Sequence, residues 1–147
     1  MVYRFLLVAV GRDEADDCFQ ETFLAALRAY SRLRSAEHLD RWLLRIATRK
    51  AIDAHRGRRR RPLPSAAIEA DADRRPTPED ESVFDPVDPL WEAVAGLPPL
   101  QRVAVVHRHV LDRSYAEIAE LMGCSAEAAR ANVYQGTKRL REEVGER

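Results

Sequence analysis

The chain has 147 residues, enough for one ordinary domain or two small ones. Of these residues, 33% are charged and 46% are hydrophobic, a composition typical of soluble globular proteins. No run of about 18 apolar residues occurs, which argues against a transmembrane helix. The apolar stretch at residues 1–10 has neither a basic start nor a small-residue cleavage site, so it does not resemble a signal peptide. We therefore expect a cytoplasmic protein with no membrane insertion.

The net charge is zero, but the charges are segregated along the chain. Basic residues dominate positions 41–62, whereas acidic residues dominate positions 63–90. Every proline lies between Pro62 and Pro99, and proline disrupts helix interiors. We therefore predict an all-α protein with two small helical domains, at residues 1–62 and 88–147. An acidic, Pro-rich linker at residues 63–87 would join them.

The first segment shows helical periodicity. Around residues 14–30, one apolar stripe comprises Phe19, Phe23, Ala26, Leu27 and Tyr30, with Glu14, Asp17, Glu21 and Arg28 on the opposite side. A second helix is expected at about residues 37–55, with a core face of Leu39, Trp42, Leu43, Ile46 and Ala47. Its other sides are also apolar, at Leu44, Ala51 and Ile52, which predicts a helix lying between neighbours.

The second segment contains several helix boundary signals. Asp88 followed by Pro89 is typical of a helix start. Another helix is expected after residues 97–99, marked by Leu100, Val103, Val106, His107 and Val110. Ser114 and Glu117 form a capping box ahead of a short helix that Gly123 ends. Ser125 can cap the last helix, whose predicted inner face is Ala129, Val133, Gly136 and Leu140.

These last two helices fit a helix-turn-helix, because small residues permit a close crossing and Gly123 permits the turn. The second helix would present to DNA its outward residues Glu127, Ala128, Arg130, Ala131, Tyr134, Gln135 and Lys138. Arg and Gln side chains can contact base edges in the major groove. A plain helical hairpin with a solvated charged face is the alternative.

A ridge of arginines follows the predicted helix at residues 37–55. It consists of Arg41, Arg45, Arg49 and Arg56, and it continues into the arginine run at residues 58–61. Arg suits phosphate binding and base stacking better than Lys does, so the ridge favours nucleic-acid binding over a merely solvated face. Trp42 shares this helix and fits the core as well as it fits a base-stacking platform.

An acidic face is expected on the first long helix, at Glu14, Asp16, Asp17, Gln20 and Glu21. Acids in a first helical turn are favoured by the helix dipole, which accounts for the early members. It does not account for Glu21 or for exposed Leu24 beside it. An acidic patch with an apolar neighbour fits a basic protein partner.

The sequence offers little support for metal or catalytic chemistry. Cys18 and Cys124 are far apart and are expected to be small buried apolar groups. His107 and His109 would point to different sides of a helix, which makes a poor metal pair. A nuclease built on Asp16, Asp17 and Glu21 is disfavoured because Asp16 and Asp17 are adjacent on a helix and diverge. We expect no enzyme, metal site or cofactor.

Several blocks together resemble the extracytoplasmic-function (ECF) sigma factors of bacterial RNA polymerase. Residues 16–23 (DDCFQETF) and 42–53 (WLLRIATRKAID) resemble sigma region 2. Residues 97–102 (LPPLQR), 114–119 (SYAEIA) and 138–141 (KRLR) resemble sigma region 4. The blocks follow the family order around a variable linker and cover nearly the whole chain.

The resemblance implies a role for each block. Region 2 would bind the polymerase core through its β′ clamp helices, with Asp17, Gln20 and Glu21, and the melted minus-ten promoter element, with Trp42, Arg45, Arg49 and Lys50. Region 4 would read the minus-thirty-five element with residues 130–138. Neighbouring Asp16, Leu24, Arg41, Arg56 and Ser125 complete the predicted sites. The partners implied are the β′ and β subunits, promoter DNA and an anti-sigma factor, with a monomer expected when free. The acidic linker would lie in the RNA-exit path.

Two departures from the family pattern stand out. Family members begin with another helix before the segment that matches residues 3–10, so the start is either truncated or misplaced, or the first region is reduced. An Asn frequent in the minus-ten block corresponds here to Arg49. Two alternatives therefore stay open, a stand-alone helix-turn-helix regulator and a degenerate sigma-like protein that binds polymerase without starting transcripts.

Overall fold

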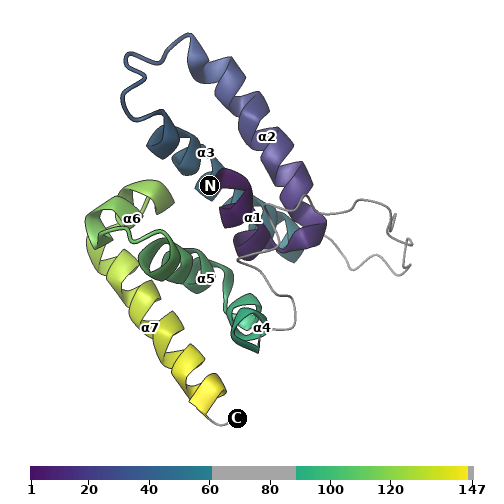
Figure 1. Cartoon of the computed structure of the whole chain (residues 1–147), viewed down its shortest axis with the longest axis vertical. Coiled ribbons are helices and arrows are strands. Elements are labelled where there is room, and N and C mark those ends of the chain that lie inside the picture. Colours follow the sequence, from purple (N-terminus) through teal and green to yellow (C-terminus); the bar gives the residue numbers. More distant parts are fainter. Residues whose placement is uncertain (61–88, 146–147) are drawn as a thin grey trace.

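The computed structural model describes residues 1–60 and 89–145, and this part of the chain is helical, with no strand (Figure 1). Seven α-helices and one π-helical turn follow one another in the described residues. The all-α prediction is therefore confirmed. The linker predicted at residues 63–87, the helix cap predicted at Asp88, and the side chains of the arginine run at residues 58–61 lie outside the described residues.

Three helices form the N-terminal part: α1 (Val2–Val10), α2 (Arg12–Tyr30) and α3 (Leu39–Arg60). Gly11 alone separates α1 from α2, and its φ of 87° lies in the region that glycine adopts without strain. This sharp turn lets α2 fold back against α1, where the Tyr3 and Phe19 rings meet edge to face at 5.5 Å. In Figure 1, α2 and α3 lie side by side, and α1 packs against both.

The buried face of α2 differs from the predicted apolar stripe. The structure buries Ala15, Cys18, Thr22 and Ala26, four small residues of this helix. Phe23, Leu27 and Tyr30 are exposed, Leu27 by 73%. Small side chains bring α2 close to α1 and α3, and the larger rings then extend beyond the contact. The prediction of one inward apolar stripe is wrong at these three positions.

Helix α3 lies between neighbours, as its apolar circumference predicted. It contacts α1 and α2 and also α5 and α6. Its buried residues are Leu44, Ala47, Thr48, Ala51, Ile52 and His55. The predicted core face is only half right, because Ala47 is buried, Leu43 and Ile46 are half-buried, and Leu39 is exposed. The half-buried Trp42 stays accessible at one edge of the helix.

The C-terminal part comprises α4 (Pro89–Gly96), α5 (Pro99–Val105), the π-helical turn η1 (Val106–Val110), α6 (Tyr115–Met122) and α7 (Ala126–Gly145). Pro89 and Pro99 occupy first helical positions, where the missing N–H has no partner to lose. The helix predicted across residue 106 changes there to the wider π form. That change turns His107 fully inward and leaves His109 exposed beside Thr137.

One hydrophobic core joins the two parts of the chain. Its buried members include Phe5 and Leu44 from the N-terminal helices and Val94, Val106 and Leu121 from the C-terminal ones. Cys18 belongs to it, and Cys124 is half-buried beside a smaller cluster, where burial raises the pKa of its thiol. In residues 1–60 and 89–145, no helix is both long and apolar enough to cross a membrane.

Candidate nucleic-acid interface

Helices α6 and α7 form the predicted helix-turn-helix, and local contacts define each end. The Ser114 hydroxyl accepts from the Glu117 N–H at 3.2 Å, and the Glu117 carboxylate accepts from the Ser114 N–H at 2.8 Å. Gly123 ends α6 in the left-handed conformation, with φ 67°. The Ser125 hydroxyl then accepts from the Ala128 N–H at 3.1 Å. The capping box, the turn and the second cap are confirmed as predicted.

Tight packing against the preceding helices fixes the orientation of α7. Ala129 and Val133 are buried with Ala104 of α5 and with Ile118 and Ala119 of α6. Further along, a Cβ atom at Gly136 would lie 2.6 Å from Cγ2 of Val105, so α7 crosses α5 at this glycine. The predicted inner face of α7 is confirmed, with Leu140 half-buried at its end.

The outward face of α7 carries the side chains that the sequence predicted. Six are exposed: Glu127, Arg130, Ala131, Tyr134, Gln135 and Lys138. Two other predicted residues make hydrogen bonds within the helix-turn-helix itself. The Ser125 hydroxyl caps α7, and the carbonyl of half-buried Ala128 accepts from the Asn132 side chain. Lys138 lies 3.8 Å from Glu142 on the same helix. The remaining face combines polar side chains, a tyrosine that is 68% exposed and two cations.

One tyrosine links α7 to the turn before α6. The Tyr115 ring lies between two guanidinium groups, with Cζ of Arg108 at 5.0 Å and Cζ of Arg130 at 5.2 Å from its centroid. Cation–π contacts of this length orient a flexible arginine. Arg108 also donates to the Arg113 carbonyl at 3.0 Å. Neither Arg108 nor Tyr115 was among the predicted binding residues.

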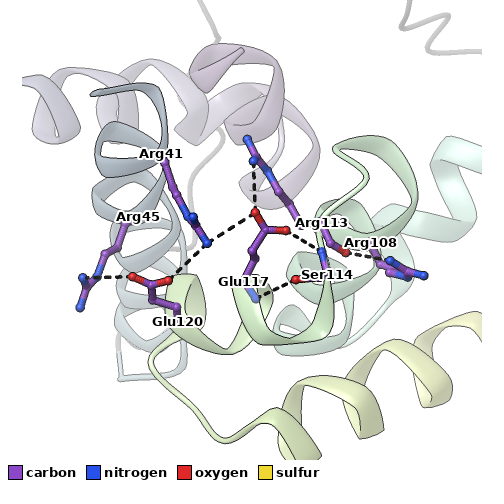
Figure 2. A network of polar contacts seen from close by, with 7 residues as sticks. All are labelled: Arg41, Arg45, Arg108, Arg113, Ser114, Glu117 and Glu120. Carbon is purple, nitrogen blue, oxygen red and sulfur yellow. Dashed lines mark hydrogen bonds and ion pairs between the residues drawn. The ribbon is translucent and has the colours of Figure 1, made fainter. Parts of the chain in front are cut away.

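The predicted arginine ridge lies along α3, and α6 covers its N-terminal end (Figure 2). Nη2 of Arg41 is 3.4 Å from carboxylate oxygens of both Glu117 and Glu120. Nη1 of Arg45 is 3.9 Å from the other oxygen of Glu120. On the far side of α3, the Lys50 amine lies 3.9 Å from the Glu21 carboxylate. Arg49 and Arg56 are exposed.

Figure 2 also shows how Glu117 is held. Besides its capping contacts, its carboxylate lies 3.7 Å from Nη1 of Arg113. The Ser114 backbone and side-chain hydrogen bonds lower the pKa of Glu117, and the charges of Arg41 and Arg113 lower it further. Glu117 is therefore ionised at neutral pH and offers Arg41 a fixed negative charge.

Beneath these surface ion pairs, buried polar contacts join the two parts of the chain. The Thr48 hydroxyl donates to the Leu44 carbonyl at 2.7 Å and lies 3.0 Å from Nε2 of His107. Because the hydroxyl has a single proton, His107 must donate from Nε2, which makes Nδ1 the unprotonated nitrogen of a neutral ring. The ring stacks on Phe5 at 4.7 Å. Burial, and then the charge of Arg113, lower the His107 pKa from 6.5 to about 4.

The carboxyl end of α1 is a second buried junction. The Ala9 carbonyl accepts from Nε2 of His55 at 2.7 Å and from Nη1 of Arg102 at 3.2 Å. Arg102 also donates to the carbonyls of Ala95 and Leu97. A terminal carbonyl without an intrahelical partner is thus satisfied by side chains from α3 and α5.

The predicted acidic face of α2 is exposed at Asp17, Gln20, Glu21 and Leu24. Their three- and four-residue spacing places them on one side of the helix. Asp16 is half-buried instead, and its carboxylate accepts from the Tyr3 hydroxyl at 3.0 Å. The exposed Phe23, Leu27 and Tyr30 continue this surface toward the end of α2.

Comparison with known proteins matches both halves of this arrangement. Residues 1–61 match the model of Sigma-70 region 2, and residues 88–140 match that of Sigma-70, region 4. The RNA polymerase sigma factor CarQ of Myxococcus xanthus is 36% identical over 90% of this chain and 75% of its own length. The chain belongs to the ECF family of RNA polymerase sigma factors.

Other relatives extend this comparison. The ECF RNA polymerase sigma factor SigG of Mycobacterium tuberculosis is 32% identical over 86% of this sigma factor, which spans only 41% of that relative's length. The sigma factor RpoE of Bartonella quintana, solved in complex with the anti-sigma factor NepR, superimposes with a TM-score of 0.73 at 22% identity. That likeness covers 98% of this chain and 89% of RpoE, and it shows the shared fold.

Sequence analysis missed the contacts between the two regions of this sigma factor. No sequence pattern indicated that Arg41 contacts Glu117 and Glu120 of α6. Arg41 and Glu120, for example, lie 79 positions apart in the chain. The Arg102 and His107 contacts were missed for the same reason. Residues 97–102 were recognised as a family block, and that block could have drawn attention to Arg102.

Proposed function

We propose that this chain directs bacterial RNA polymerase core enzyme to specific promoters and supports DNA-templated transcription initiation. The observation that carries the proposal is the exposed polar face of α7 on a correctly capped helix-turn-helix, in one chain with the arginine surface of α3. Residues 1–62 would act as region 2 and residues 88–147 as region 4, joined by the linker. The chain acts by binding, and its role requires no catalytic residue.

Region 4 is proposed to read the minus-thirty-five element. Helix α7 exposes Arg130, Gln135 and Lys138, with Arg130 over the Tyr115 ring and Lys138 3.8 Å from Glu142. Arg and Gln can bond bidentately to base edges, each worth about 1–3 kcal/mol of discrimination. Ala131 is small enough to contact a thymine methyl group, and Tyr134 adds an exposed ring.

Region 2 is proposed to bind the melted minus-ten element along α3. Arg49 and Arg56 are exposed, and Trp42 is accessible at the edge of the helix. Arg41, Arg45 and Lys50 join this site in the proposal, although each faces a carboxylate in the structure. The planar guanidinium of arginine binds phosphate through two N–H groups and stacks on bases, whereas the lysine amine acts as a point charge. Stacking requires unpaired bases, which supports a single-stranded ligand.

The polymerase core is proposed to dock on α2. Asp17, Gln20 and Glu21 supply charge for a basic surface, with Asp16 at its half-buried edge. Leu24 and Leu27 are exposed beside them, which is the apolar centre that a protein interface needs. The partners proposed are the β′ and β subunits, and because these are cytoplasmic the chain would act there. An anti-sigma factor is a further proposed partner, since the related RpoE was solved with one.

A reconstituted transcription assay tests this function. The purified chain and core polymerase are incubated with genomic fragments of the host, and transcript starts are mapped. We expect discrete starts that require the chain and share two upstream elements. The α7 variant Arg130→Ala/Gln135→Ala should lose these starts while still binding the core enzyme. Core binding without any starts would favour a degenerate sigma factor, and the absence of both would overturn the proposal.

A further inference from the structure

We propose that an apolar pocket between α1 and η1 binds a small amphipathic anion, with its hydrocarbon tail in the pocket and its carboxylate on Arg4. The pocket has a volume of about 320 Å³, at the lower end of the range of small-molecule sites. None of the described residues that line it belongs to the DNA or polymerase surfaces proposed above. The binding is therefore separate from the promoter function.

The buried part of the pocket lining comes from both regions of the chain. Phe5 and Val8 of α1 and Val106 of η1 line the pocket, and all three side chains are buried. Helix α1 belongs to region 2 and η1 to region 4, and ligand pockets occur preferentially at junctions of this kind. A hydrocarbon tail placed here would leave water and contact apolar side chains of both regions.

The π-helical form of η1 brings three apolar side chains to this pocket. The Leu111 N–H donates to the Val106 carbonyl, five positions earlier, at 3.1 Å. Residues four and five apart therefore lie about one turn apart, so Val110 and Leu111 line the pocket together with Val106. Val110 is 46% exposed, which places it at the rim. Single π turns of this kind occur frequently at functional sites.

The charge at the rim favours an anion. Arg4 is exposed and is the only charged side chain among the described residues that line the pocket. A guanidinium binds a carboxylate through two parallel N–H groups. A cation beside an apolar pocket fits a ligand with a negative head and a hydrocarbon tail, whereas it would repel a cationic amphiphile.

Isothermal titration calorimetry on the full-length chain tests the ligand class, with decanoate as the probe. We expect one decanoate to bind per chain. Octanoate should bind about ten-fold more weakly, because its shorter tail buries less apolar surface. Decan-1-ol has the same tail without the charge and should bind about three- to five-fold more weakly than decanoate. Equal affinities for decanoate and decan-1-ol, or no binding of decanoate, would overturn the proposal.

Two pairs of matched variants locate the site. Arg4→Gln should bind decanoate and decan-1-ol alike, whereas Arg12→Gln removes an exposed arginine outside the pocket and should keep the preference for decanoate. Val110→Trp should fill the pocket and weaken decanoate binding about ten-fold or more. Its control is Val144→Trp on α7, because Val144 is 44% exposed and lies outside the pocket. Circular dichroism checks that all four variants fold.

The variants also distinguish the pocket from other apolar surfaces. If Arg4→Gln and Val110→Trp both bind decanoate like their controls, the ligand adsorbs elsewhere on the chain and the proposed site is wrong.

Hydrogen exchange on the wild type examines the same contact without a substitution. We expect decanoate to slow amide exchange in α1 and in η1 together, because the ligand contacts both. Protection confined to α2, where Leu24 and Leu27 are exposed, or absent from α1 and η1, would contradict the proposal. Neither measurement involves DNA or polymerase, so a failure here leaves the proposed promoter function untouched.

Discussion

The buried His107 couples the stability of the molecule to pH. Above pH 6.5, His107 is neutral in the folded and the unfolded chain. Between pH 6.5 and about 4, His107 is protonated in the unfolded chain but stays neutral in the folded chain. The reason is that burial and the charge of Arg113 lower its pKa in the folded chain. The free energy of unfolding should therefore fall with falling pH across this interval, by up to about 3 kcal/mol.

Urea unfolding at several pH values checks this dependence, with His107→Gln as the comparison. Glutamine keeps a donor for Thr48 but does not titrate, so the variant should lose less stability than the wild type between pH 6.5 and 4. Parallel pH profiles for the two proteins would contradict the assignment. Glutamine should also lower stability at neutral pH, because it cannot stack on Phe5 as the imidazole does.

The Tyr115 ring contacts Arg130, one of the proposed DNA-binding residues. Because its ring orients Arg130, Tyr115→Leu should weaken binding of minus-thirty-five duplex DNA by about two- to five-fold. Tyr115→Phe keeps the aromatic face and should bind like the wild type. Electrophoretic mobility shifts with both variants provide the measurement, and circular dichroism confirms that the helices are intact. Equal losses in both variants would indicate that the hydroxyl, and not the ring, matters.

Among the helices, the crossing of α5 and α7 depends on one missing side chain. A Cβ atom at Gly136 would meet Val105 at 2.6 Å, so Gly136→Ala should force the helices apart and destabilise the fold by about 1–3 kcal/mol. Gly57 of α3 has open space around the same position, so Gly57→Ala should stabilise the fold by about 0.5–1 kcal/mol. Thermal unfolding of the two variants gives opposite shifts if the packing is as described.

Elements with local signals could be predicted from the sequence, and those defined by distant partners could not. Ser114, Glu117, Gly123 and Ser125 were predicted correctly because a cap or turn depends on residues within one helical turn. The buried face of α2 was not, since the positions of α1 and α3 decide which side turns inward. The π-helical turn at residues 106–110 shows no periodicity of its own.

For the candidate sites, the same division holds. The exposed face of α7 follows from helical spacing, and the family resemblance added the roles. The pairing of Arg41 with α6 depends on tertiary structure, which no local pattern encodes. Asp16 was placed with the exposed acids, and only the contact with Tyr3 shows that it faces α1.

At the level of the whole molecule, DNA binding should depend steeply on salt. If about six cations of α3 and α7 contact phosphates, affinity for promoter DNA should fall roughly a thousand-fold or more between 50 and 200 mM salt. Promoter DNA is titrated with the holoenzyme and with the core enzyme alone at several salt concentrations. The difference between the two slopes gives the salt dependence of DNA affinity that is due to this chain. A shallow slope would indicate binding through base contacts and stacking.

The shared core also determines how the connection between the two regions is constrained. Contacts such as Thr48 with His107 close a loop that includes residues 61–88. The entropy cost of closing a flexible loop grows only with the logarithm of its length, by about 0.6 kcal/mol for each doubling. Relatives could therefore lengthen this connection considerably and still keep their two regions together. The length of this connection is therefore nearly free to change without separating the two regions.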